Sequence, residues 1–176
     1  IIAATIPACI AGFLFSGLIE TYLRSPLIIA STTIIFGVIL FVADSFVGKK
    51  NEKNITIYIA FLIGLAQVLS LIPGVSRSGI TLSMALFLGF NRVSATRFSF
   101  LLSIPIILLA SGYEGLKLLQ STFDVQWDKI ATAIAISFIS GYACIHLFLK
   151  AVSRFSITPF VIYRLFLGVV LFFIFF

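Results

Sequence analysis

The sequence predicts an all-α integral membrane protein, a bundle of transmembrane helices that includes one re-entrant helical hairpin. Three observations predict this class: 61% of the 176 residues are apolar, only 10% are charged, and the mean hydropathy is +1.22. A soluble domain is usually about a quarter charged, because its surface faces water. An apolar run of roughly 18 residues is long enough for a helix to cross a bilayer.

The predicted crossings follow the uncharged runs of the chain. Four runs carry no Asp, Glu, Lys or Arg: Ile1–Ile19, Ser25–Ala43, Asn54–Ser76 and Ile130–Leu149. We expect single-pass helices over five segments: Ile2–Ile19, Pro26–Val47, Ala95–Gly112, Ile130–Leu149 and Thr158–Phe176. Between the third and the fourth we expect an external loop, Tyr113–Lys129, which carries Glu114, Asp124 and Asp128.

The charges predict how the chain is oriented. The net charge is +6, which in a membrane protein points to the cytoplasmic excess of Lys and Arg rather than to nucleic acid. Seven basic residues lie at the ends that we assign to the cytoplasm: Lys49, Lys50, Lys53, Arg92, Arg97, Lys150 and Arg154. Three lie at the opposite ends: Arg24, Lys117 and Lys129. We therefore expect a multi-pass membrane protein whose more basic ends lie in the cytoplasm.

The third apolar run is interrupted in the middle of the chain. Ile55–Ile72 stops at Pro73-Gly74, a pair that breaks helices. The next apolar stretch, Ile80–Phe90, has eleven residues, which as a helix make roughly 16 Å, about half of a ~30 Å hydrocarbon core. We therefore expect a re-entrant hairpin over residues 55–90 within a single domain, 1–176, with its loop at membrane depth.

The loop of this hairpin, residues 73–81, carries the predicted site. Non-helical backbone at membrane depth occurs only where protein or a watery cavity surrounds it, and a charge there indicates function. The loop combines a guanidinium, hydroxyls, glycines and the start of a helix expected near Ile80, and such a set binds phosphate. The candidate residues are Gly74, Ser76, Arg77, Ser78, Gly79 and Thr81.

Other interpretations of the same loop stay open at this point. It could be an ordinary polar turn at the membrane surface, with Arg77 snorkelling toward water. It could also hold a phosphorylated lipid in a transporter or flippase, since carriers bind anions at broken helices near the midplane. A structural membrane subunit is the third alternative. Cys9 and Cys144 lie in apolar runs, and we expect them to pack rather than to bind metal.

Three segments resemble a known family. They are Gly64-Leu-Ala-Gln67 with the string Pro-Gly-x-Ser-Arg-Ser-Gly-x-Thr over residues 73–81, then Ala95–Pro105, then Ile157–Arg164. Together they look like the undecaprenyl-diphosphate phosphatases, the bacitracin-resistance family. The resemblance implies inverted repeats, each with a re-entrant hairpin, around a site open to the extracytoplasmic face of the bacterial inner membrane. It also implies hydrolysis of a polyprenyl diphosphate for peptidoglycan synthesis, a divalent cation (Mg or Ca) and a homodimer.

The resemblance also implies roles for single residues. Arg77 would bind the diphosphate and stabilise the transition state, and it would be catalytic together with Ser76. The hydroxyls around the phosphates would be those of Ser76, Ser78 and Thr81. Gly74 and Gly79 would form the loop. In members of the family, the first half of the chain carries a Glu-rich signature and a catalytic His. This chain begins inside an apolar segment, and we expect it to begin after that region. We therefore expect a C-terminal part of a longer chain that is inactive by itself and has no metal ligands of its own. His146 is not expected to be catalytic, and Arg164 is open between snorkelling and a structural pairing.

Overall fold

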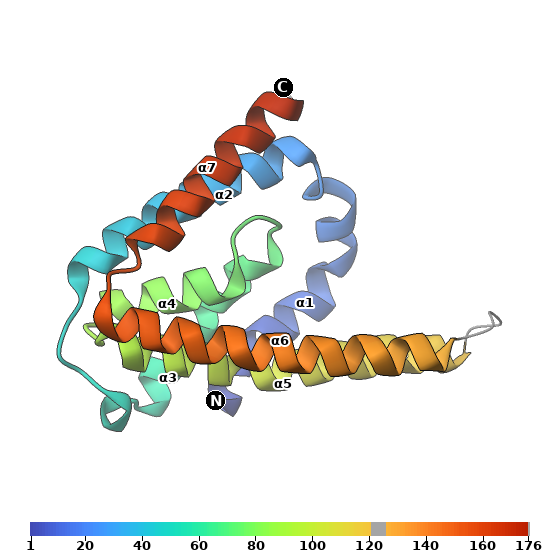
Figure 1. The fold of residues 1–176 in the computed structure, drawn as a ribbon, viewed down its shortest axis with the longest axis horizontal. Coiled ribbons are helices and arrows are strands. Elements are labelled where there is room, and N and C mark those ends of the chain that lie inside the picture. The colour runs from blue at the N-terminus through green and yellow to red at the C-terminus, as the bar shows by residue number, and fades with distance from the viewer. Residues whose placement is uncertain (121–125, 176) are drawn as a thin grey trace.

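The computed structural model describes residues 1–120 and 126–175, and its main elements are helices (Figure 1). In chain order they are α1 (Ile2–Tyr22), α2 (Pro26–Ala43), α3 (Ile57–Val68), α4 (Arg77–Phe87), α5 (Arg92–Gln120), α6 (Trp127–Arg154) and α7 (Thr158–Phe175). Three short 3-10 turns add to them: η1 (Asp44–Phe46), η2 (Glu52–Asn54) and η3 (Leu69–Leu71). The predicted helical class is confirmed.

Within the described residues, four helical segments are long and apolar enough to cross a membrane. They are Pro26–Phe46, Arg92–Gln120, Trp127–Arg154 and Thr158–Phe175. The first predicted crossing falls in α1, where the apolar stretch Ile2–Phe15 is shorter. The chain is therefore a multi-pass membrane protein, as its composition predicts.

Two pairs of helices dominate the arrangement in Figure 1. Helices α2 and α7 lie side by side in opposite directions, and α5 and α6 form a second, longer antiparallel pair. Helix α1 packs closely on α3, because a Cβ on Gly64 would lie only 2.4 Å from the carbonyl oxygen of Ala4. Helix α4 lies between these groups and contacts α2, α3 and α5.

The buried apolar core surrounds the short helix α4. Its members come mainly from α2, α3, α4, α5 and the start of α7, and the largest fully buried ones are Phe90, Leu40, Ile63, Leu86, Leu102 and Ile157. Helix α6 contributes only Val152 to the buried residues, so almost its whole length presents apolar side chains outward. Exposed apolar helix surface is what lipid covers in a membrane protein.

The two basic clusters that flank the hairpin meet at one end of the bundle. The backbone N–H of Lys50 donates to the carbonyl oxygen of Gly89 (3.1 Å), and the N–H of Asn91 donates back to that of Lys50 (2.9 Å). Arg92 donates to both carboxylate oxygens of Asp44, at 2.6 and 3.1 Å. The basic residues on both sides of the hairpin thus lie at the same end of the bundle. The direction of the protein in the membrane stays a prediction.

The predicted external loop Tyr113–Lys129 is wrong in its bounds. Helix α5 continues to Gln120 and α6 begins at Trp127, so Glu114 and Asp128 lie on helices, while Asp124 lies outside the described residues. The extra turns of α5 are stabilised locally. Lys117 lies 3.4 Å from the carboxylate of Glu114 and 4.3 Å from the centre of the Tyr113 ring, at i,i+3 and i,i+4 spacing.

Two short helices, α3 and α4, occupy the segment of the predicted hairpin and pack on each other. Helix α4 has eleven residues, the length expected for a half-membrane segment. Its position relative to a bilayer, and thus the re-entrant and inverted-repeat parts of the expectation, stay predictions.

Candidate functional site

The loop that carries the candidate residues is shorter than the sequence predicts. Helix α4 begins at Arg77 and not near Ile80, so only residues 72–76 connect η3 to it. The reason is a cap: the Oγ of Ser76 accepts a hydrogen bond from the N–H of Gly79 (3.3 Å), as Ser commonly does at a helix start. Arg77, Ser78 and Gly79 therefore form the first turn of α4, where N–H groups and the helix dipole favour an anion.

The backbone of the loop is held in an uncommon conformation. Gly74 has φ = +91°, and Ser76, a residue with a side chain, has φ = +65°. A positive φ at a residue other than glycine is uncommon and costs free energy, so surrounding contacts must hold it. The two hydroxyls nearest the α4 N-terminus, Ser76 Oγ and Ser78 Oγ, lie 3.4 Å apart as a result.

Helix α2 holds one side of this loop. Thr32 Oγ1 donates to the carbonyl oxygen of Pro73 (2.6 Å), and Thr33 Oγ1 lies 3.4 Å from that of Gly74. The approach is close, because a Cβ on Gly74 would lie 2.2 Å from Thr32 Oγ1 and 2.5 Å from the carbonyl oxygen of Ile29. Gly74 is thus required by space as well as by φ, which agrees with its predicted part in forming the loop.

Helix α7 holds the other side through Arg164. Its Nη2 donates to the carbonyl oxygens of Gly74 (2.8 Å) and Val75 (3.0 Å), and only 4% of the residue is exposed. Of the two interpretations left open for Arg164, the structural pairing is confirmed. The sequence signal for it is a single charge in the otherwise uncharged apolar segment 158–175.

Thr81 and Gly79 have surroundings different from those of a flexible phosphate loop. Thr81 lies in the second turn of α4, 1% exposed, with its Oγ1 2.9 Å from the carbonyl oxygen of Arg77 and 2.7 Å from Ser99 Oγ. Gly79 lies inside the helix, and its missing Cβ leaves space for Arg164 Nη1. Both residues support the turn from within the protein, and a contact of Thr81 with phosphate stays a prediction.

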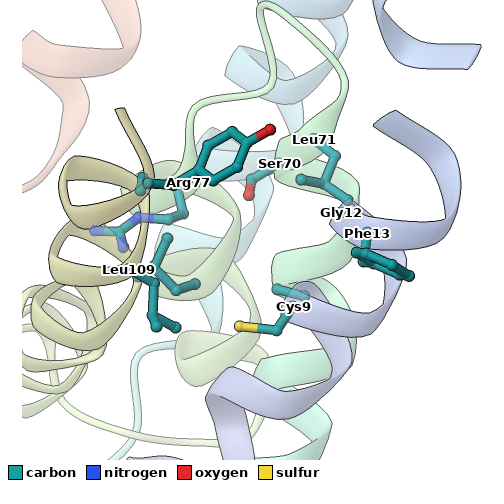
Figure 2. A pocket seen from close by; sticks show the side chains of 11 residues that line it. Cys9, Gly12, Phe13, Ser70, Leu71, Arg77 and Leu109 are labelled. Atoms are coloured by element: carbon teal, nitrogen blue, oxygen red, sulfur yellow. The ribbon is translucent and has the colours of Figure 1, made fainter. Parts of the chain in front are cut away.

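A largely apolar cavity of about 620 Å³ opens beside Arg77. Figure 2 shows Cys9, Gly12 and Phe13 of α1 on one side, Ser70 and Leu71 of η3 next to them, and Arg77 and Leu109 on the other side. Among the eleven lining residues Arg77 is the charged one. Its Nη1 is buried and has no hydrogen-bond partner among the described residues. A buried guanidinium nitrogen at a cavity wall can donate a hydrogen bond to an anion that enters the cavity.

The surroundings of Arg77 do not fit a divalent cation. Mg²⁺ and Ca²⁺ prefer carboxylate and other oxygen ligands, but the described residues contain no group of three or more His, Cys, Asp or Glu that could hold a metal. Gln67, on α3, is fully buried with its Nε2 3.4 Å from the carbonyl oxygen of Ala4 and its Oε1 unpaired. His146 is exposed on α6, while the hydrogen bonds that hold the loop come from α2 and α7.

Several residues at the site were not expected from the sequence. Thr32, Thr33 and Ser99 are hydroxyl residues inside apolar helices, a pattern that normally means only a hydrogen bond to the helix's own backbone. Their contacts with the loop and with α4 depend on how the helices pack, which no local pattern encodes.

Comparison with known proteins places the chain in a family. Residues 1–170 match the family described as Bacitracin resistance protein BacA. The chain belongs to this family. It is 59% identical over 172 residues to an undecaprenyl-diphosphatase of Campylobacter curvus and 55% identical over 173 residues to one of Teredinibacter turnerae. In both alignments 98% of the chain is matched, and the chain spans 65% and 66% of the respective relative's length. The predicted resemblance is confirmed, and the candidate site residues, within 73–81, lie in the matched segment.

Proposed function

We propose that the complete protein hydrolyses undecaprenyl diphosphate to undecaprenyl phosphate and inorganic phosphate, with Arg77 at the reacting diphosphate. Such a reaction recycles a lipid carrier for peptidoglycan synthesis and fits a role in bacitracin resistance. One observation carries the proposal: a buried guanidinium nitrogen of Arg77, with no partner among the described residues, lies at a largely apolar cavity inside a membrane protein. A ligand with an anionic head and a long apolar tail matches that combination.

The chemistry follows from the start of α4. The guanidinium of Arg77 can bind two phosphate oxygens at once, and the first-turn N–H groups add partial positive charge. The Oγ of Ser76 accepts from the N–H of Gly79, so its own hydrogen can be donated to Ser78 Oγ, 3.4 Å away, or to a phosphate oxygen. Water supplies the oxygen that ends in inorganic phosphate, and the bond from the terminal phosphorus to the bridging oxygen breaks. Charge that accumulates on the phosphoryl oxygens and the leaving oxygen is stabilised by Arg77.

The wider setting is part of the proposal. The site would face the extracytoplasmic side of the bacterial inner membrane, the protein would form a homodimer, and it would depend on a divalent cation. The charge distribution and the family resemblance support the first point, and the resemblance alone supports the other two. The carboxylates that such a cation requires would come from outside the described residues of this chain.

The test is phosphate release from undecaprenyl diphosphate by the complete purified protein, with Arg77→Ala and Arg77→Lys beside it. We expect Arg77→Ala to lower kcat/KM by about 10²-fold or more, since a transition-state contact is lost. Arg77→Lys keeps the charge but loses the two-pronged contact, so it should recover only part of the activity. An unaltered rate in folded Arg77→Ala would contradict the site, and lipid movement without phosphate release would replace the enzyme by the transporter alternative.

A further inference from the structure

Arg164 is an unusual residue for its position in the fold. It is the single charged residue of α7, and only 4% of it is exposed. A guanidinium buried in an apolar bundle is costly unless hydrogen bonds satisfy it. The residues that Arg164 contacts should therefore show which groups its guanidinium binds.

The contacts of Arg164 point to the site loop. Its Nη2 donates hydrogen bonds to the carbonyl oxygens of Gly74 and Val75, at 2.8 and 3.0 Å. These are the two peptide units directly before Ser76, the residue with φ = +65°. Fixing both carbonyls fixes the direction in which the chain enters α4, and with it the positions of Ser76 and Arg77.

The first turn of α4 is shaped to receive the same guanidinium. A Cβ on Gly79 would lie 2.6 Å from Arg164 Nη1 and 3.3 Å from Ser76 Oγ. A glycine is therefore needed at this place to let the arginine reach the turn, although its backbone is ordinary helix. Arg164 Nη1 and Ser76 Oγ lie close to this one point, so the clamp and the capping hydroxyl are neighbours.

Arg164 does not line the cavity beside Arg77. Its charge therefore supports the loop from the protein side, while Arg77 lies on the ligand side. Removing Arg164 would leave the charge of Arg77 in place but would free the loop that aims it. A displacement of about 1 Å in a reacting geometry can lower a rate roughly 10²-fold.

We propose that Arg164 is a positioning residue that acts through the Gly74 and Val75 carbonyls to hold Ser76 and Arg77 in their working geometry. Gly79 is the second part of this device, because it admits the guanidinium. The inference rests on the proposed function for its effect on rate. Its structural part, the clamp on the loop, stands apart from that function and is tested separately.

The structural part is tested by thiol labelling in the complete protein. All native cysteines are replaced by alanine, and Val75→Cys, at a fully buried position, reports on loop opening. With Arg164 present, a small membrane-permeant maleimide should label this thiol slowly. With Arg164→Met, which keeps length but loses the hydrogen bonds, labelling should be about tenfold faster or more, and Arg164→Lys should be intermediate. Arg154→Met, at an exposed arginine of α6, is the matched control and should change nothing.

The functional part is tested by phosphate-release kinetics of the same variants without the reporter cysteine. For folded Arg164→Lys and for Gly79→Ala we expect kcat to fall about 10²-fold with KM changed less than about threefold, because positioning and not substrate contact is lost. A residue that only stabilises the fold would instead lower the amount of active protein and leave its kcat unchanged. Arg164→Lys and Gly79→Ala keep the proposal testable if Arg164→Met does not fold.

The two failures are distinguishable. Labelling of Val75→Cys that is equally slow in all variants overturns the clamp, whatever the activity. Faster labelling together with an unchanged kcat overturns the positioning role but leaves the clamp in place. A complete wild-type protein that releases no phosphate overturns the proposed function, while the labelling result still decides whether Arg164 holds the loop.

Discussion

Thr81 and Ser99 share a hydrogen bond between their hydroxyls, 2.7 Å apart, that joins α4 to α5 directly beneath the Arg77 turn. Both residues are buried, at 1% and 3% exposure. Ser99 Oγ also lies 3.3 Å from the carbonyl oxygen of Ser78, so the pair ties the first turn of the site helix to its neighbour. In this structure Thr81 therefore anchors α4 to α5 through its hydroxyl.

Replacing Thr81 by Val should weaken this joint. Val has nearly the same shape, so we expect a loss of about 1 kcal/mol in the free energy of unfolding, the net value of one buried hydrogen bond. Ser99→Ala should cost a similar amount, and the double variant should cost less than the sum, because the two hydroxyls are partners. Unfolding by denaturant titration in detergent micelles measures this. Strict additivity of the two losses would contradict the pairing.

Replacing Gly74 by Ala should disrupt the loop. The new Cβ would lie 2.2 Å from Thr32 Oγ1, and φ = +91° is unfavourable for alanine. We expect a loss of at least about 1–3 kcal/mol in the free energy of unfolding and a large loss of activity, since strain and overlap add. Gly112→Ala is the matched control. That glycine lies in α5 with nothing within 4 Å of the new Cβ, so alanine should be neutral or stabilising by up to about 1 kcal/mol.

Breaking the Asp44–Arg92 ion pair should loosen the basic end of the bundle. The pair is bidentate, at 2.6 and 3.1 Å, and the Asp44 side chain is only 9% exposed. We expect Asp44→Ala to lower the free energy of unfolding by about 1.5–3 kcal/mol, the range for hydrogen bonds to charged groups. Glu52→Ala removes the exposed pair with Arg97 (3.4 Å) and should cost less than about 1 kcal/mol. Equal losses in thermal or denaturant unfolding would refute the distinction.

The sequence is sufficient for most of the helices and for the break in front of the candidate site. Uncharged runs predict the membrane helices, and Pro73 with Gly74 predicts the break that separates α3 from α4. The predicted start of α4, near Ile80, is three residues too late, because the polar Arg77 and Ser78 are typical of a loop. A cap from Ser76 outweighs that local polarity and brings both residues into the helix.

What the sequence cannot give is the support of the loop from distant segments. Thr32 contacts Pro73 across 41 residues, and Arg164 contacts Gly74 across 90. Such contacts follow from the packing of α2 and α7 around α4, and helix packing is not a local property of the chain. The bounds of the predicted external loop are wrong because its local pattern is ambiguous. Polar residues such as Glu114 and Lys117 suit an amphipathic end of a long helix as well as a loop.

Cys9 offers a direct test of the cavity beside Arg77. Its side chain lines the cavity together with Arg77, and it is a free, exposed thiol, whereas Cys144 lies on α6 outside it. In a complete protein whose single cysteine is Cys9, a bulky maleimide should block phosphate release, because it fills the space proposed for the lipid. Undecaprenyl diphosphate should slow that labelling. With Cys144 as the single cysteine, the same reagent should leave activity unchanged. If labelled Cys9 protein keeps full activity, the lipid does not enter by this cavity, and Arg77 must meet its ligand from another side.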